Sequence, residues 1–261
     1  MKRSPVVLRA ALAAAALMGL TQGARAEEGL GPIRVDQWGF FQRNPNGSDQ
    51  WQYRPRLYVP WSLANGWTVT QRADLPMVYT DDKGSANPAG GFSGGIGNAF
   101  LETMLDAPAT TPGLVWRAIL RLTFPSPKGS PFGKDDQYQV AAGLGLSYRL
   151  AEVWNGITLE PIMRYNWGAR PNPPTTQLVS SLDLYPAVTF GLGEGWSLAL
   201  YPENPITYNR NNGQWFMPLD LMVLHRVNRD FEFGIGAAVK LGNPANPSYD
   251  YVIDGRATFY F

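Results

Sequence analysis

The sequence predicts an all-β protein, an antiparallel transmembrane β-barrel of about 12 strands (roughly 10–14) that follows a cleaved signal peptide. Three observations predict it: a last segment that alternates and ends on an aromatic residue, a secretory N-terminus, and connections that alternate in length. In the segment 249–261, apolar residues share one face, and charged or polar residues share the other. A transmembrane barrel turns the apolar face to lipid and the charged face to its lumen.

The N-terminus has the three parts of a secretory signal. Lys2, Arg3 and Arg9 form a basic region, 10–20 is an apolar run, and Ala24-Arg25-Ala26 is a small-x-small cleavage site. The apolar run is too short to span a bilayer as a helix. We therefore expect export of the chain across the inner membrane.

Cleavage after Ala26 divides the chain into a signal peptide, 1–26, and a barrel, 27–261. The signal holds four basic residues, so the mature chain has 18 basic and 21 acidic side chains and a net charge of −3. The mature chain has no excess of basic residues, so its charge does not indicate nucleic acid as a partner. The absence of cysteine excludes disulfides, thiolate metal sites and a lipoprotein anchor. The 28 glycines and 22 prolines fit many strands joined by turns.

Turn signals divide the mature chain into an even number of strand-length segments. The segments are 32–44, 51–61, 66–79, 94–106, 113–125, 137–150, 156–167, 177–191, 195–203, 214–227, 231–241 and 248–261. Short connections such as 192–194 alternate with longer polar ones such as 80–91 and 204–213. This alternation is typical of periplasmic turns and extracellular loops, and it places both termini on the short-turn side. The first segment shows no clear alternation, so its faces stay open.

Tryptophans recur at the ends of these segments. Trp51 and Trp61 share one face ten residues apart, which at ~3.3 Å per residue and a ~40° tilt is roughly 25 Å along the membrane normal. That is the height of an outer-membrane apolar band, and the alternative is chance placement in a tryptophan-rich chain. The predicted interfacial girdle is Trp51, Trp61, Trp67, Trp116, Trp167, Trp196 and Trp215.

Prolines within the segments argue against a regular barrel, which has no edge strand to accept them. They are Pro55, Pro60, Pro76, Pro161, Pro186, Pro202 and Pro218. We expect bulges or polar partners in the lumen to compensate for the missing hydrogen bonds.

Alternation assigns most charged residues of the segments to the lumen. In the first half these are Arg54, Arg56, Arg72, Asp74, Glu102, Arg117, Arg121 and Arg149. In the second half they are Glu160, Arg164, Asp183, Glu203, Asp220, Arg226, Glu232, Lys240, Asp250, Asp254 and Arg256. Such groups would cost ~2–4 kcal/mol each in hydrocarbon near the midplane. Two interpretations remain: a water-filled conduit for polar solutes, and a lumen closed by a salt-bridge network.

The sign of the charge at mid-height suggests a transverse field. Arg56, Arg72 and Arg121 fall near the middle of the first half of the wall. Asp183, Asp220 and Asp254 fall near the middle of the second half, and Glu102 and Arg256 are exceptions. Facing rows of opposite sign would orient dipolar or carboxylated solutes.

Several short motifs carry a resemblance to a known family. They are Leu75-Pro76, Gly95-Ile96-Gly97-Asn98, Phe124-Pro125-Ser126, Tyr185-Pro186 and Trp215-Phe216-Met217-Pro218. Over nearly the whole mature chain the sequence resembles the outer-membrane transporters labelled "MetA-pathway of phenol degradation", although that family more often has Asp where this chain has Asn98. The resemblance implies a barrel that moves small compounds, aromatic ones included.

Catalytic and ligand-binding signals are weak. The single histidine, His225, lies in phase with lipid-facing residues near the periplasmic end, whereas a lipid hydrolase would need its base near the outer-leaflet loops. Asp81, Asp82, Asp135 and Asp136 could bind divalent cations but are more simply solvated loop acids. The glycine clusters lack the strand-to-helix context of phosphate loops. The sequence therefore predicts no enzyme, no cofactor and no metal site.

The leading functional hypothesis is an outer-membrane channel for passive passage of small polar or carboxylated molecules. The expected partners are outer-membrane lipid and lipopolysaccharide, the solute, and the barrel-assembly machinery, which would recognise the last strand and its terminal Phe261. An outer-membrane lipid hydrolase and a purely structural or adhesive barrel are the alternatives. Substrate identity and oligomeric state stay open.

Overall fold

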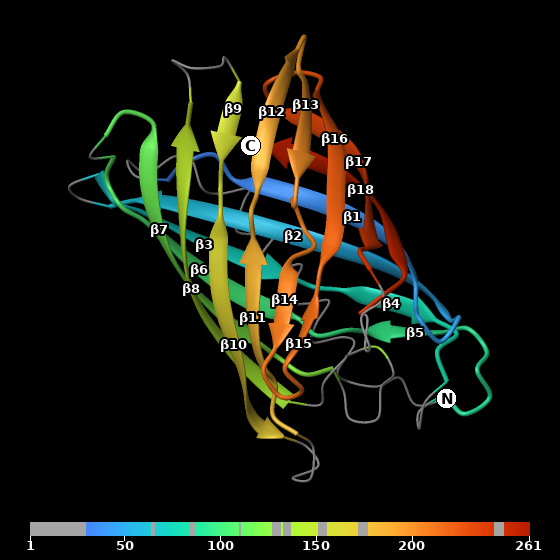
Figure 1. The fold of residues 1–261 in the computed structure, drawn as a ribbon. Coiled ribbons are helices and arrows are strands. Elements are labelled where there is room, and N and C mark those ends of the chain that lie inside the picture. Colours follow the sequence, from blue (N-terminus) through green and yellow to red (C-terminus); the bar gives the residue numbers. More distant parts are fainter. Residues whose placement is uncertain are drawn as a thin grey trace, which may run out of the picture.

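A computed structural model of the protein describes residues 30–261 except 64–65, 84–86, 110, 127–131, 133–136, 151–155, 172–176 and 243–247. The predicted signal peptide lies outside the described residues. Within them, no helix is long and apolar enough to cross a membrane. The described chain is a single curved sheet of antiparallel strands (Figure 1).

The sheet has twelve strands, six of them continuous and six interrupted once. The continuous strands are β1 (Arg34–Arg43), β2 (Asp49–Ser62), β7 (Leu114–Thr123), β8 (Gln137–Arg149), β17 (Phe231–Lys240) and β18 (Tyr251–Tyr260). The interrupted strands are β3 with β4 (Thr68–Asp74, Met77–Thr80), β5 with β6 (Ser93–Ile96, Phe100–Asp106), β9 with β10 (Ile157–Leu159, Ile162–Pro171), β11 with β12 (Ser180–Tyr185, Val188–Gly193), β13 with β14 (Trp196–Leu200, Ile206–Asn209) and β15 with β16 (Gln214–Phe216, Pro218–Arg226).

Each strand pairs with its neighbours in the chain, and β1 pairs with β18 to close the sheet. The closing register runs from Arg34 opposite Tyr260 to Arg43 opposite Tyr251. It is extended by hydrogen bonds between the backbones of Ile33 and Phe261, 2.9 and 3.2 Å long. The predicted twelve-strand antiparallel barrel is therefore confirmed.

One predicted connection was wrong. The polar stretch 204–213 was expected to be a loop, but it contains β14, which continues the line of β13 and pairs with β11 and β15. Only the turn 210–213 leaves the sheet there. The sequence misled because Pro202 and Pro205 lie within the interruption and resemble the end of a strand.

The interruptions explain most of the prolines. Pro76, Pro161, Pro186 and Pro202 lie in interruptions, and Pro218 directly follows one. Pro55 lies inside β2 opposite the gap between β3 and β4, where its carbonyl accepts the N–H of Leu75 at 3.2 Å. Neighbouring interruptions also bond to each other, since the N–H of Gly97 donates to the carbonyl of Pro76 at 2.9 Å. A proline opposite an interruption removes no regular ladder bond.

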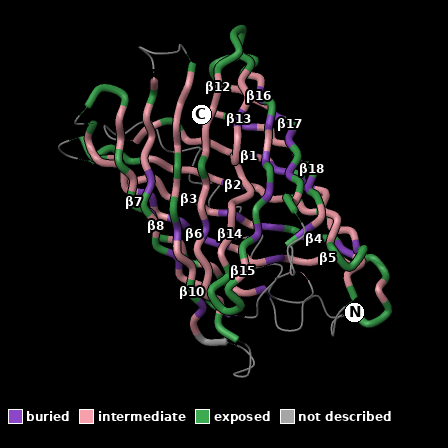
Figure 2. The backbone as a smooth tube through the Cα atoms, in the orientation of Figure 1, coloured by how far each residue is buried: buried purple, intermediate pink, exposed green. Residues whose placement is uncertain are grey.

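Exposed and buried residues alternate along the strands (Figure 2). In β17, Ile235 is 67% exposed on the outer surface, whereas Ala238 on the inner face is fully buried. All seven tryptophans of the predicted girdle are exposed, by 39–55%. In β1, whose faces stayed open, Trp38 and Phe40 are buried on the inner side. The exterior is therefore apolar and rich in aromatic residues, as a membrane-facing surface requires.

Replacing Ile235 at the middle of β17 by Arg tests this orientation. The guanidinium would face the bilayer midplane, so we expect the free energy of unfolding in lipid to fall by about 2–4 kcal/mol. Denaturant titration, followed by the faster migration of folded barrel on unboiled gels, measures the change. Ile235→Leu is the matched control and should unfold like the parent protein. Equal stability of the Arg variant would contradict the assigned face.

Candidate functional site

The barrel encloses a cavity of about 1280 Å³ lined by charged and aromatic side chains. Nine of the twelve residues predicted to line a pore border it. They are Arg54, Arg56, Arg72, Glu102, Arg117, Arg121, Asp183, Glu232 and Arg256. The cavity is the candidate functional site because it concentrates these charged groups.

Arg149, Asp220 and Asp254 do not border the cavity, which corrects the prediction for these three. Arg149 is the last residue of β8 and is exposed at the rim. Asp220 is fully buried because the chain at Glu203 folds over it, and its carboxylate accepts the backbone N–H of that residue at 3.0 Å. Asp254 is buried against β17, where its carboxylate occupies the space that a Cβ on Gly236 would need.

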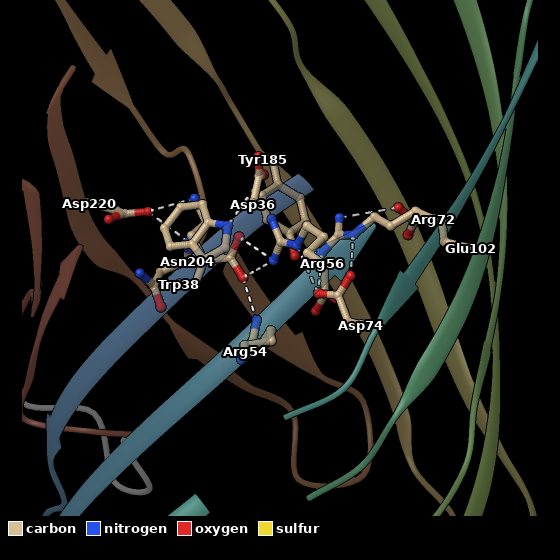
Figure 3. A network of polar contacts seen from close by, with 12 residues as sticks. Asp36, Trp38, Arg54, Arg56, Arg72, Asp74, Glu102, Tyr185, Asn204 and Asp220 are labelled. Carbon is tan, nitrogen blue, oxygen red and sulfur yellow. Dashed lines mark hydrogen bonds and ion pairs between the residues drawn. The ribbon is translucent and has the colours of Figure 1, made fainter. Parts of the chain in front are cut away.

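Register places opposite charges directly beside each other across neighbouring strands. Arg56 on β2 lies opposite Asp74 on β3, and its Nε donates to that carboxylate at 2.9 Å. Glu102 on β6 lies opposite both Arg72 on β3 and Arg121 on β7, at 3.3 and 2.6 Å. These pairs form one continuous row on the inner wall (Figure 3).

A second group of contacts spans the cavity. Glu203 lies between β13 and β14. Its carboxylate accepts a hydrogen bond from Arg54 at 2.5 Å, and its two oxygens accept hydrogen bonds from Arg56 at 2.9 and 3.0 Å. Four strands separate these elements on one side of the barrel and six on the other, so the contacts join nearly opposite walls. Arg164 on β10 contacts Glu102, which lies beyond β7 and β8, at 3.3 Å, and it also pairs with Asp183 on the adjacent strand β11 at 2.9 Å.

We call the whole set the ionic belt. It consists of Arg54, Arg56, Arg72, Asp74, Glu102, Arg121, Arg164, Asp183 and Glu203. It differs from the predicted facing rows of opposite sign, because most of its arginines pair with carboxylates of the same half of the wall. Pairing at a few ångströms cancels most of the transverse field that separate rows would create.

The guanidiniums of the ionic belt lie over the faces of aromatic rings. Trp38 and Phe40 stack on each other, with Arg56 over the first ring at 5.1 Å and Arg54 over the second at 4.7 Å. Phe100 lies under Arg72 and Arg121, and Tyr185 under Arg164. The sequence did not indicate Trp38, Phe40 and Phe100, because the faces of the first segment stayed open and Phe100 was assigned to neither face. Cation–π contacts hold these guanidiniums in fixed orientations.

The remaining sequence candidates lie apart from the belt. His225 is stacked on Trp196 at 4.2 Å, and no hydrogen bond of the described residues joins it to a serine or a carboxylate. Asp81 accepts the backbone N–H of Asp49, and Asp82 accepts from Asn46. Asp135 and Asp136 lie outside the described residues, and in the part that is described no group of three His, Cys, Asp or Glu could hold a metal.

No family model matches the chain, and no curated protein matches it. Among solved structures, the COG4313 outer membrane channel from Pseudomonas putida F1 is similar over 90% of this chain and 97% of its own, with 15% identity and a TM-score of 0.67. The NanC porin follows with 12% identity, 87% and 98% coverage and a TM-score of 0.52. Outer membrane phospholipase A from Escherichia coli has 9% identity, 94% and 96% coverage and a TM-score of 0.51. The chain has the fold of bacterial outer-membrane β-barrels.

Glu102 is the carboxylate with the most arginine partners in the belt. Its replacement by Ala would leave Arg72, Arg121 and Arg164 short of one buried counter-charge, so we expect a loss of about 3–5 kcal/mol in the free energy of unfolding. Glu102→Gln keeps an acceptor oxygen and should lose less. Denaturant titration in detergent micelles measures both variants. A loss below ~1 kcal/mol for Glu102→Ala would show that the belt is not a structural network.

Proposed function

We propose that the protein is a channel of the bacterial outer membrane through which small molecules pass passively. The observation that carries this proposal is the cavity of about 1280 Å³ inside a closed barrel, with its lining of charged groups. Charged side chains in such number favour water in the cavity, because leaving them dry would be costly. The fold shared with a solved outer-membrane channel and a porin is consistent with the same role.

The solutes that fit best are polar or carboxylated molecules, aromatic ones among them. Guanidiniums bind carboxylates through paired, charge-assisted hydrogen bonds. Trp38, Phe40, Phe100 and Tyr185 lie under these guanidiniums and hold them in place for a carboxylate. The resemblance to the "MetA-pathway of phenol degradation" transporters favours the same class, and membership in that family stays a prediction.

Catalysis is the second candidate, because outer membrane phospholipase A shares the fold. The surroundings of His225 argue against it, since the ring packs between Trp196 and Phe233 instead of beside a nucleophile. We therefore assign the histidine no catalytic role. A barrel with a permanently closed lumen is the third candidate, and the contacts of Glu203 across the cavity are the observation in its favour.

Outer-membrane lipid and lipopolysaccharide are the partners that the apolar exterior would contact. Phe261, 77% exposed at the end of the closing strand, is accessible to the assembly machinery. Both assignments rest on the barrel standing in the outer membrane after export.

Reconstitution of the purified protein into planar lipid bilayers tests the proposed function. We expect discrete conductance steps in potassium chloride. Lipid vesicles that contain the reconstituted protein and a fluorescent phospholipid provide the matched assay for phospholipid hydrolysis. A correctly folded barrel that gives no steps, or one that releases fatty acid, would contradict the channel proposal.

Ion selectivity should follow the charge of the belt, which holds five guanidiniums and four carboxylates. Replacing Arg72 and Arg121 by Ala leaves three guanidiniums, so we expect the preference to shift toward cations. The reversal potential in a salt gradient measures the shift. The control removes Arg43 and Arg229, which lie outside the cavity and are exposed. Salt screens such charges, so equal shifts in the two double variants would contradict the role of the belt.

A further inference from the structure

The interruption between β13 and β14 differs from the other five that the described strands contain. It spans the five residues 201–205, whereas the others span one to three. Tyr201 adopts a left-handed conformation with φ of 51°, which is unfavourable for a non-glycine residue. A strained, enlarged interruption on the inner wall requires compensation by the surrounding structure.

Asp220 on β16 provides this compensation. Its carboxylate accepts hydrogen bonds from the backbone N–H groups of Glu203 and Asn204 at 3.0 and 2.7 Å. Its backbone carbonyl accepts a hydrogen bond from the backbone N–H of Tyr201 at 2.9 Å. The hydroxyl of Tyr201 donates to the carbonyl of Pro218 at 3.0 Å. The backbone is therefore fixed, and the side chain of Glu203 borders the cavity.

The opposite wall presents a ready-made receptor for a carboxylate. Arg54 and Arg56 hold the carboxylate of Glu203 with three hydrogen bonds of 2.5–3.0 Å. Both guanidiniums rest on the stacked rings of Trp38 and Phe40. Arg56 also keeps Asp74 as a partner, whereas within the described part of the chain Arg54 has an ion pair with Glu203 alone. The two guanidiniums thus belong to one wall of the barrel, on β2, and the carboxylate that they bind comes from the opposite wall, between β13 and β14.

We propose that Arg54 and Arg56 form a binding site for the carboxylate of a small solute, and that Glu203 occupies this site as an internal competitor. The inference rests on the proposed channel function and specifies its solute. An incoming carboxylate replaces the glutamate on the two guanidiniums, and the contact that bridges the cavity opens.

Exchange of one carboxylate for another explains why a charged solute would open the bridge and a neutral one would not. A neutral solute in the place of the glutamate would take both the counter-charge and the contacting water away from Arg54, which is unfavourable. A carboxylate restores the charge-assisted hydrogen bonds as the glutamate leaves. The glutamate itself can then be solvated in the water of the cavity.

The test compares benzoate binding to the parent protein and to Glu203→Ala by isothermal titration calorimetry of the folded, detergent-solubilised barrel. Internal competition lowers the apparent affinity by the fraction of receptor that is free. If the glutamate is bound nine-tenths of the time, its removal should tighten benzoate binding about tenfold. Benzyl alcohol has the ring without the charge, so its affinity for the parent protein and for Glu203→Ala should be the same.

Matched variants separate this site from a general effect of charge. Glu160→Ala also removes a carboxylate that lines the cavity, but Glu160 accepts a hydrogen bond from Ser147 and contacts neither Arg54 nor Arg56, so benzoate affinity should stay unchanged. Arg54→Gln, in the background of Glu203→Ala, should lose most of the gained affinity. Should Glu203→Ala fail to fold, Glu203→Gln preserves the size of the side chain, and the same tightening is expected.

The outcomes distinguish this inference from the proposed channel function. Equal benzoate affinity of the parent and both Glu203 variants, or no binding to any of them, overturns the internal competitor. Equal tightening in Glu160→Ala overturns it as well, because a non-specific gain of positive charge would then suffice. Tightening confined to the Glu203 variants supports it even if none of the proteins conducts in planar bilayers, and in that case only the channel proposal fails.

Discussion

Closure of the strand ladder between β1 and β18 is the constraint on which the rest of the structure depends. A chain that crosses lipid must satisfy its backbone hydrogen bonds internally, and only a sheet without edges can do so with strands. The ten residue pairs of this seam complete the ring. The side chains reinforce it from inside, since Thr258 of the last strand donates to Asp36 of the first at 2.9 Å. Once the ring is closed, inward charges can meet only one another, the solvent or a solute.

The same constraint decides where prolines can stand. A proline in an uninterrupted ladder would leave a carbonyl of the neighbouring strand without a donor. The barrel avoids this by placing interruptions beside one another, so that the bonds of adjacent gaps join, as between Glu160 and Ala187 at 2.8 Å. At the largest gap the chain leaves the wall altogether and carries Glu203 inward. The irregularity that proline imposes on the strands thus supplies a carboxylate that reaches the opposite wall.

The sequence was sufficient for the fold and for most of the inner face, because alternation with period two is a local property. The sequence did not predict that β14 is a strand, and it did not predict which residues contact each other in the ionic belt. The strand β14 has only four residues, and its polar neighbours resemble a loop. Trp38 and Phe40 face inward, where they lie under arginines of the neighbouring strand β2. Contacts such as that of Arg54 with Glu203, 149 positions apart, depend on the stagger of all the strands between them.

The pairing within the belt changes what the charges can do for a solute. Two separate rows would act through a long-range field, which water and salt in the cavity would weaken. Paired charges act instead at contact, where each guanidinium already has the geometry that a carboxylate requires. With five guanidiniums against four carboxylates, the belt keeps a surplus of one positive charge when all its members are ionised. An anion entering the cavity therefore meets a net attraction and a set of partners that can be exchanged one for one, whereas a cation meets neither.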